Sequence, residues 1–228
     1  MNETAAVEQE KVRAVPVLEA FLVIVVTFFL GAILGAIFLF ALGEGPALVF
    51  SELIILLVPL GYLLFKRVDI KRYIGLDVNP KLVLMGFASA ALLLAVDIAV
   101  TIALTSLFGE SQVVQESNNA IVELSSSTEG LIWVALALGL AGVCEEFAFR
   151  GFLQSTLTRR YSFIPALIIS AFVFGLFHFD PQLVYILSAM TAGLVLGYVY
   201  HRWDSYVVSA IAHSSVNLLV LAAMLLIV

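Results

Sequence analysis

The sequence predicts an all-α integral membrane protein with about seven transmembrane helices. Of its 228 residues, 62% are hydrophobic and only 12% are charged, and the mean hydropathy is +1.11. The apolar residues form runs of about 18 or more, which is long enough for a helix to cross a hydrocarbon core about 30 Å thick. The alternating pattern of a membrane-spanning β-barrel is absent. We therefore expect a polytopic helical bundle that occupies residues 1–228 as a single domain.

Seven apolar segments define the predicted helices. They lie at 17–42, 48–65, 82–108, 131–157, 163–179, 183–200 and 206–228. Gly43, Gly45 and Pro46 predict a turn after the first segment, and Asn79-Pro80 predicts a break before the third. The first segment is too long for the core of a signal peptide, so we expect a spanning helix and no removed segment.

Small residues recur at four-residue spacing on two of these segments. Gly31 and Gly35 lie on the first, and Ala189, Gly193 and Gly197 lie on the sixth. Such spacing allows helix backbones to approach closely in a membrane. We therefore expect the sixth segment to pack tightly against a neighbour.

The placement of basic residues predicts the orientation of the chain. Short cytoplasmic loops collect Lys and Arg. With seven helices, the basic residues outside the helices fall in the N-terminal segment and in three loops, at 66–81, 158–162 and 201–205. The other three loops, at 43–47, 109–129 and 180–182, contain none. This asymmetry predicts a multi-pass protein of the cell membrane with a cytoplasmic N-terminus.

Other global features limit the possible chemistry. The net charge of −6 gives no indication of nucleic-acid binding, and the lipid bilayer is the expected environment. The single cysteine, Cys144, excludes an internal disulfide and any site with several cysteine ligands. No basic neighbour in the sequence lowers the pKa of its thiol, so we interpret Cys144 as a packed small residue.

The most informative stretch is 144–150, which carries three charged side chains inside a predicted transmembrane helix. A charged group at membrane depth costs a few kcal/mol or more and marks a functional-site candidate. Glu146 and Arg150 are four residues apart with the acid first, which favours an ion pair. Glu145 lies about 100° around the helix from Glu146. We therefore expect one carboxylate paired with Arg150 and the other free for chemistry.

Further polar residues interrupt the later and middle helices. His178 closes the fifth segment, and His213 and Asn217 lie one helical turn apart early in the seventh. Any one buried histidine is more often a structural hydrogen-bonding residue than a catalytic one. Together with the glutamates and Arg150, however, these residues indicate one polar site. Asp97 in the third segment either lines a polar cavity or bonds to a neighbouring helix.

Two chemistries suit this set of residues. A carboxylate beside a neutral histidine can remove a proton from water, while His and Asn donate hydrogen bonds to a developing oxyanion. Alternatively, Glu145, His178 and His213 could bind Zn²⁺ and leave a position open for water. No His-Glu-x-x-His signature is present to favour zinc. The residue spacing leaves both chemistries open.

Three motifs carry a resemblance to a known family. They are Glu145-Glu146-x-x-x-Arg150, Phe174-x-x-x-His178 and His213-x-x-x-Asn217, in that order on late hydrophobic helices. The chain resembles the CPBP family, which comprises CAAX prenyl endopeptidases and bacteriocin-processing, Abi-like intramembrane proteases. The resemblance covers the catalytic core at about 131–219.

The resemblance implies hydrolysis of a peptide bond in a membrane-associated peptide or protein. It implies that Glu145 activates water beside His178 and that His213 and Asn217 bind the oxyanion. Glu146, Arg150 and Phe174 take supporting positions. A glutamate-type mechanism without a metal cofactor is favoured over zinc. The alternative is a non-enzymatic membrane scaffold, regulator or bacteriocin-immunity protein, because some similar proteins act in that way.

The predicted helices raise one geometric problem. At about 1.5 Å per residue, His178 lies about 20 Å beyond the cytoplasmic start of its helix. Glu145 and His213 are predicted nearer mid-membrane or the cytoplasmic face. We therefore expect the fifth helix to be strongly tilted, or its boundaries to differ, if His178 is to reach Glu145.

Overall fold

The structure, a computed structural model, describes residues 15–227 and is helical throughout its regular elements. The predicted polar N-terminal segment, residues 1–14, lies outside the described residues. The elements in chain order are α2 (Val17–Leu42), α3 (Glu44–Phe65), α4 (Ile70–Ile74), α5 (Pro80–Phe108), α6 (Gln112–Leu124), α7 (Thr128–Glu146), η1 (Phe147–Gln154), α8 (Ser155–Thr158), α9 (Phe163–Phe177), α10 (Val184–Trp203) and α11 (Tyr206–Ile227).

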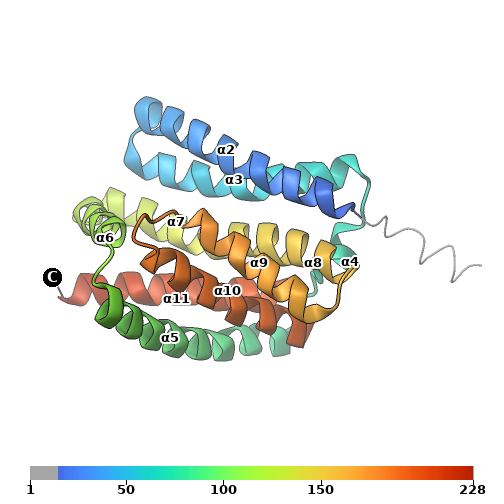
Figure 1. Cartoon of the computed structure of the whole chain (residues 1–228). Helices are drawn as coiled ribbons and strands as arrows, with labels where there is room; N and C mark the ends of the chain where they lie inside the picture. The colour runs from blue at the N-terminus through green and yellow to red at the C-terminus, as the bar shows by residue number, and fades with distance from the viewer. Residues whose placement is uncertain (1–14, 228) are drawn as a thin grey trace, which may run out of the picture.

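The bundle is built around the column formed by α7, η1 and α8. Figure 1 shows the α2–α3 hairpin along one side of this column and α5, α10 and α11 along the other. The column packs against α3, α9 and α11, while α6 lies across one end of the bundle. The charged stretch at 144–150 therefore lies in the middle of the molecule, where helices from both halves of the chain meet.

The predicted fold class is confirmed. Six of the described helices are long and apolar enough to cross a membrane, and α9 is apolar but has only 15 residues. The first predicted helix, at 17–42, has the observed bounds, and the fourth is continuous from Thr128 to Thr158. The orientation and the cytoplasmic N-terminus stay predictions.

Three local predictions need correction. Only Gly43 breaks the chain after α2, with φ of 86°, and α3 begins at Glu44. Pro46 lies in the first turn of α3, where its missing N–H is not needed. The loop at 66–81 contains α4, whose N-terminus is capped by Asp69 accepting from the amide of Arg72 at 3.2 Å. The loop predicted at 109–129 also contains a helix, α6, which runs over Gln112–Leu124.

Glycines on α10 allow the expected close packing. A Cβ at Gly193 would meet Ala171 of α9 at 3.1 Å, and one at Gly197 would meet the Gln154 side chain at 2.5 Å. The bare backbone also exposes its carbonyls to η1. Gln154 Nε2 donates to the Gly197 carbonyl at 2.9 Å. The small-residue pattern therefore predicted a real contact surface.

The stretch that follows the two glutamates is a π-helix. All eight residues of η1, Phe147–Gln154, are buried, and Phe149 and Phe152 are among its largest side chains. Segments of π-helix are rare and occur often at functional sites. This change in helix type has no signal in the sequence, because the residues of η1 suit an ordinary α-helix equally well.

Candidate active site

Glu146 and Arg150 form a fully buried ion pair. Arg150 Nη1 lies 2.9 Å from Glu146 Oε1, and neither side chain is more than 1% exposed. The expected pairing at four-residue spacing is therefore confirmed. Breaking such a pair leaves an uncompensated charge in a low-dielectric environment, which is strongly unfavourable. The pair consequently fixes the start of η1.

Arg150 has two further contacts that hold it in place. Its Nη2 donates to the Gly193 carbonyl of α10 at 3.1 Å. Its guanidinium lies 4.3 Å from the centre of the Phe174 ring of α9, which is a cation–π distance. One side chain thus links the column to α9, which carries the second motif, and to α10.

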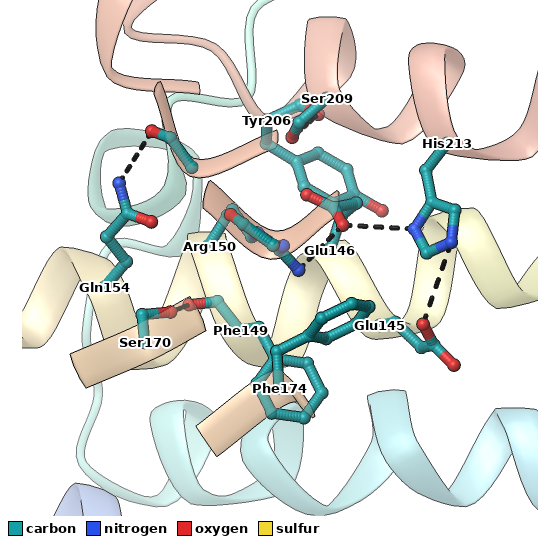
Figure 2. Close-up of polar contacts among 12 residues, drawn as sticks. Glu145, Glu146, Phe149, Arg150, Gln154, Ser170, Phe174, Tyr206, Ser209 and His213 are labelled. Carbon is teal, nitrogen blue, oxygen red and sulfur yellow. Dashed lines mark hydrogen bonds and ion pairs between the residues drawn. The ribbon is translucent and has the colours of Figure 1, made fainter. Parts of the chain in front are cut away.

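His213 of α11 lies between the two glutamates (Figure 2). Its Nδ1 is 3.1 Å from Glu146 Oε1, and its Nε2 is 3.8 Å from Glu145 Oε2. An ionised carboxylate only accepts, so Nδ1 carries the hydrogen and donates it to Glu146. This bond fixes the orientation of the ring and directs Nε2 toward Glu145.

Glu145 differs from Glu146 in its exposure and its partners. Its side chain keeps 14% of its surface exposed, whereas that of Glu146 keeps 0%. The 3.8 Å separation from His213 is too long for a direct hydrogen bond. Two polar atoms at that separation can both bind one water molecule. Glu145 is therefore the carboxylate that is available to a small reactant.

His178 lies one residue after α9 and is oriented by its own helix. Its Nδ1 is 3.0 Å from the Phe174 carbonyl, which only accepts, so Nδ1 donates. In the neutral ring, Nε2 is then left as an acceptor. The ring packs against Phe174 and against Tyr185 of α10, at centroid distances of 4.8 and 4.9 Å.

His178, His213 and Asn217 line one cavity inside the bundle. Its volume is about 240 Å³. The polar side chains among its lining residues are Asp97, Asn118, His178, Tyr185, Ser188, His213 and Asn217. Asn217 donates through Nδ2 to the Leu138 carbonyl of α7 at 3.2 Å, which leaves its second N–H available.

The expected neighbour of Glu145 is only partly recovered. The described residues show no hydrogen bond or ion pair between Glu145 and His178; His213 is the histidine beside Glu145. Phe174 packs against both imidazoles, with its centroid 6.0 Å from that of His213. The structure thus brings His178, His213 and Asn217 to one cavity, with Glu145 adjoining it through His213.

The alternative zinc site does not fit this arrangement. Within residues 15–227, no group of three or more His, Cys, Asp or Glu side chains is placed to hold a metal ion. Glu145, His178 and His213 therefore do not form a three-ligand set in this geometry. We derive no step that passes through a metal.

The turn between α9 and α10 is held by Asp180, which is 1% exposed. Its carboxylate accepts from the amides of Gln182 and Tyr185 at 3.0 and 2.9 Å. Burial alone raises the pKa of Asp180, but these amide donors and the Ser111 hydroxyl outweigh it, so the pKa lies below its usual range. This turn sets the positions of His178 and Tyr185, which flank it.

Sequence reasoning missed some polar residues near the site. Asn118, Tyr185 and Ser188 line the cavity but are ordinary residues in their segments. Glu52 of α3 was also missed, although a Glu inside an apolar helix is itself a signal. Its Oε2 is buried without a hydrogen-bond partner among the described residues, and Glu145 acts on it electrostatically.

These features define a polytopic helical membrane protein with a buried carboxylate–histidine site beside an internal cavity. Residues 127–219 match the family model described as type II CAAX prenyl endopeptidase Rce1-like. All three motifs lie inside the match, which confirms the resemblance predicted from them. The match supports an intramembrane endopeptidase with a peptide or protein substrate. No curated protein and no solved structure matches the chain.

Proposed function

We propose that this protein hydrolyses a peptide bond of a membrane-associated peptide or protein by a glutamate-type mechanism, with Glu145 as the general base. The observation that carries the proposal is the unequal treatment of two adjacent glutamates. Glu146 is sealed between Arg150 and His213, whereas Glu145 retains exposure and lies 3.8 Å from a histidine nitrogen. A base must be able to reach the proton that it removes.

Water activation is the first step of this mechanism. The Glu145 carboxylate takes one proton of a water molecule, and the oxygen attacks the carbonyl carbon of the scissile bond. The Nε2 of His178 is the acceptor for the second water hydrogen, because its Nδ1–H is donated to the Phe174 carbonyl. Positioned proton transfer of this kind contributes roughly 10²–10⁴-fold to a rate.

Oxyanion stabilisation and proton return complete the reaction. The carbonyl electrons move onto oxygen, which accepts hydrogen bonds from Asn217 and from His213 in its imidazolium form. The Nδ1–H of His213 is donated to Glu146, so the Nε2–H of the imidazolium is the donor that remains for the oxyanion. The intermediate collapses, the C–N bond breaks, and Glu145 returns its proton to the leaving nitrogen. The products are a carboxylic acid and an amine.

The test is cleavage by the purified full-length protein in lipid nanodiscs. The probe is a library of Nα-acetylated apolar peptides, and the products are identified by mass spectrometry. We expect Glu145→Gln and His178→Ala to lose at least about 10²-fold in kcat/KM while melting at the wild-type temperature. Glu129→Gln is the matched control, because Glu129 is an exposed glutamate on the same helix.

Two outcomes would contradict the proposal. Unchanged turnover in Glu145→Gln would remove the assigned base. Absence of cleavage by the wild-type protein, with loss of stability in the variants, would support a non-enzymatic scaffold or regulator. A metal assay runs in parallel: loss of cleavage with a chelator, restored by Zn²⁺, would replace the glutamate-type mechanism by the metal-dependent one.

A further inference from the structure

Asp97 of α5 is a charged residue on the wall of the cavity. Among the residues that line the cavity it is the only Asp, Glu, Lys or Arg. It lies outside residues 127–219, so the family match assigns it no role. A carboxylate in a transmembrane helix is costly unless it faces a cavity or a partner. Asp97 faces the cavity, and Ser188 of α10 lines the same cavity close enough to act on it.

A single hydroxyl such as that of Ser188 does not use the full capacity of the Asp97 carboxylate. An ionised carboxylate has two oxygens with about four acceptor sites. Asp97 is half-buried and lines the cavity, so its remaining sites face the space that His178, His213 and Asn217 also line. A donor inside the cavity can therefore reach Asp97 without displacing Ser188.

The charges around the cavity are unbalanced toward the negative. Arg150 is neutralised by Glu146, and no lysine or arginine of the described residues lines the cavity. Asp97 lies on its wall, and Glu145 adjoins it through His213. A low-dielectric cleft with one sign of charge raises the local concentration of the opposite charge. The complementary group is a cation.

The packing of α5 on α11 indicates how far Asp97 lies from the reacting groups. Gly86 contacts Ile211 so closely that a Cβ would meet it at 2.7 Å. Both helices continue from this contact in the same direction, and Asp97 lies eleven residues on while His213 lies two residues on. At about 1.5 Å per residue, the axial offset between Asp97 and His213 is on the order of 10 Å.

We propose that Asp97 binds a basic side chain of the substrate, within about three residues of the scissile bond, and so makes the protein selective for cationic peptide segments. The offset corresponds to one long side chain plus one or two extended residues, at about 3.3–3.6 Å each. The cavity is smaller than the roughly 300–1,000 Å³ of drug-sized pockets. It therefore suits one side chain beside the scissile peptide. This inference rests on the proposed function.

Two other roles for Asp97 make different predictions. A purely structural carboxylate, bonded to Ser188, would affect stability and no substrate preference. A residue that acts on His213 would change kcat equally for all substrates. A specificity residue changes kcat/KM only for substrates that carry the basic group.

The cleavage test compares three residues, lysine, norleucine and glutamate, at one position at a time. A lysine is walked through the positions flanking the cleavage site of an Nα-acetylated apolar peptide, with norleucine or glutamate as replacements. We expect wild type to favour lysine over norleucine by about tenfold or more in kcat/KM, and Asp97→Asn to lose that preference. Asp97→Lys should instead favour glutamate. Asp77→Asn, an exposed acid before the same helix, is the control.

A binding test separates this inference from the proposed reaction. Affinities of the same peptides are measured by fluorescence anisotropy for Glu145→Gln and for Glu145→Gln with Asp97→Asn. A lysine preference that depends on Asp97, without any wild-type cleavage, would support the cation site and contradict the peptidase. Cleavage without a lysine preference would do the reverse, and absence of both would overturn both. Peptides with a free N-terminal ammonium and norleucine test whether a terminal amine substitutes for the side chain.

The remaining outcomes also decide the question. An equal fall in kcat for lysine and norleucine peptides in Asp97→Asn would show that Asp97 acts on His213 and not on the substrate. That result would overturn the inference. A lowered melting temperature of Asp97→Asn with the lysine preference retained would show that Asp97 is a structural residue beside Ser188. That result would also overturn the inference. The Asn side chain has the same size and keeps an acceptor for Ser188, so we expect Asp97→Asn to fold.

Discussion

Glu145 and Glu146 are adjacent in the sequence but occupy opposite kinds of environment. Glu146 is completely buried, and one of its oxygens contacts both Arg150 and His213. Glu145 keeps part of its surface and has no hydrogen bond of its own, with His213 as its nearest described basic group at 3.8 Å. One residue step rotates a side chain by about 100° around a helix.

The difference teaches that compensation, rather than burial alone, separates a structural charge from a reactive one. The charge of Glu146 is cancelled within hydrogen-bonding distance, so it contributes to folding. The charge of Glu145 is left for a molecule that enters the site. His213 joins the two sides, because one ring nitrogen serves each glutamate.

The largest expected effect comes from breaking the buried ion pair between Glu146 and Arg150. Arg150→Met should lower the free energy of unfolding by about 3–5 kcal/mol, because Glu146 becomes an unpaired buried charge. Adding Glu146→Leu should restore most of that loss. The measurement is unfolding in a denaturing detergent, followed by helix content. A fully folded and stable Arg150→Met would show that the pair does not hold η1 in place.

Changing His213 tests the residue that the two glutamates share. His213→Ala should lower stability by about 1.5–3 kcal/mol through the lost bond to Glu146. Cleavage should fall by about 10²–10³-fold through the lost oxyanion donor. Asn217→Ala is the comparison, since the described residues show no hydrogen bond from Asn217 to either glutamate, and it should affect cleavage more than folding. Equal stability of wild type and His213→Ala would contradict the bond to Glu146.

Asp180 provides a pH-dependent test outside the membrane-spanning segments. Its pKa is lower in the folded than in the unfolded chain, so its stabilisation is present above the unfolded value, about 3.9, and is lost as pH falls through the folded value. Asp180→Asn should therefore cost about 1 kcal/mol at neutral pH. The two proteins should converge in acid.

Melting temperatures of wild type and Asp180→Asn across pH 7 to 3 measure this difference. A gap that stays constant with pH would mean that the charge of Asp180 does not hold the turn. We also expect cleavage to fall at neutral pH in this variant, because the turn positions His178.

The smallest expected effect sharpens the environment of Glu145. Glu52→Gln should raise stability by about 0.5 kcal/mol, because it removes a buried carboxylate that faces a second one. Glu44→Gln, an exposed change on the same helix, should leave the melting temperature unchanged. A destabilised Glu52→Gln would show that the carboxylate has a partner that it needs.

Much of the fold could be predicted from the sequence, because membrane helices leave strong composition signals. The positions and lengths of the apolar runs located the helices, and neither depends on contacts between distant segments. The ion pair of Glu146 with Arg150 followed from four-residue spacing, and the close packing of α10 followed from Gly193 and Gly197. Boundaries were less certain, as the start of α3 at Glu44 and the unpredicted α4 show.

Parts of the site could not be predicted, because they depend on contacts between distant segments. Sequence order could not show that His213 lies beside Glu145, or that the ring of Phe174 packs against both His178 and His213. It also left open whether Asp97 faces a cavity or a helix. The structure places Asp97 on the wall of the cavity, which Ser188 of α10 also lines.

The sequence by itself determined the class of the protein, the membrane-spanning segments and the two glutamates with Arg150 as an unusual buried group. Hydrophobicity and helical periodicity are local properties, so the amino-acid sequence alone is enough to determine them. Only the tertiary structure decided which glutamate is sealed and which histidine lies beside the other. Those outcomes depend on how α7, α9 and α11 pack, and this packing sets the distance and the solvation of each charge.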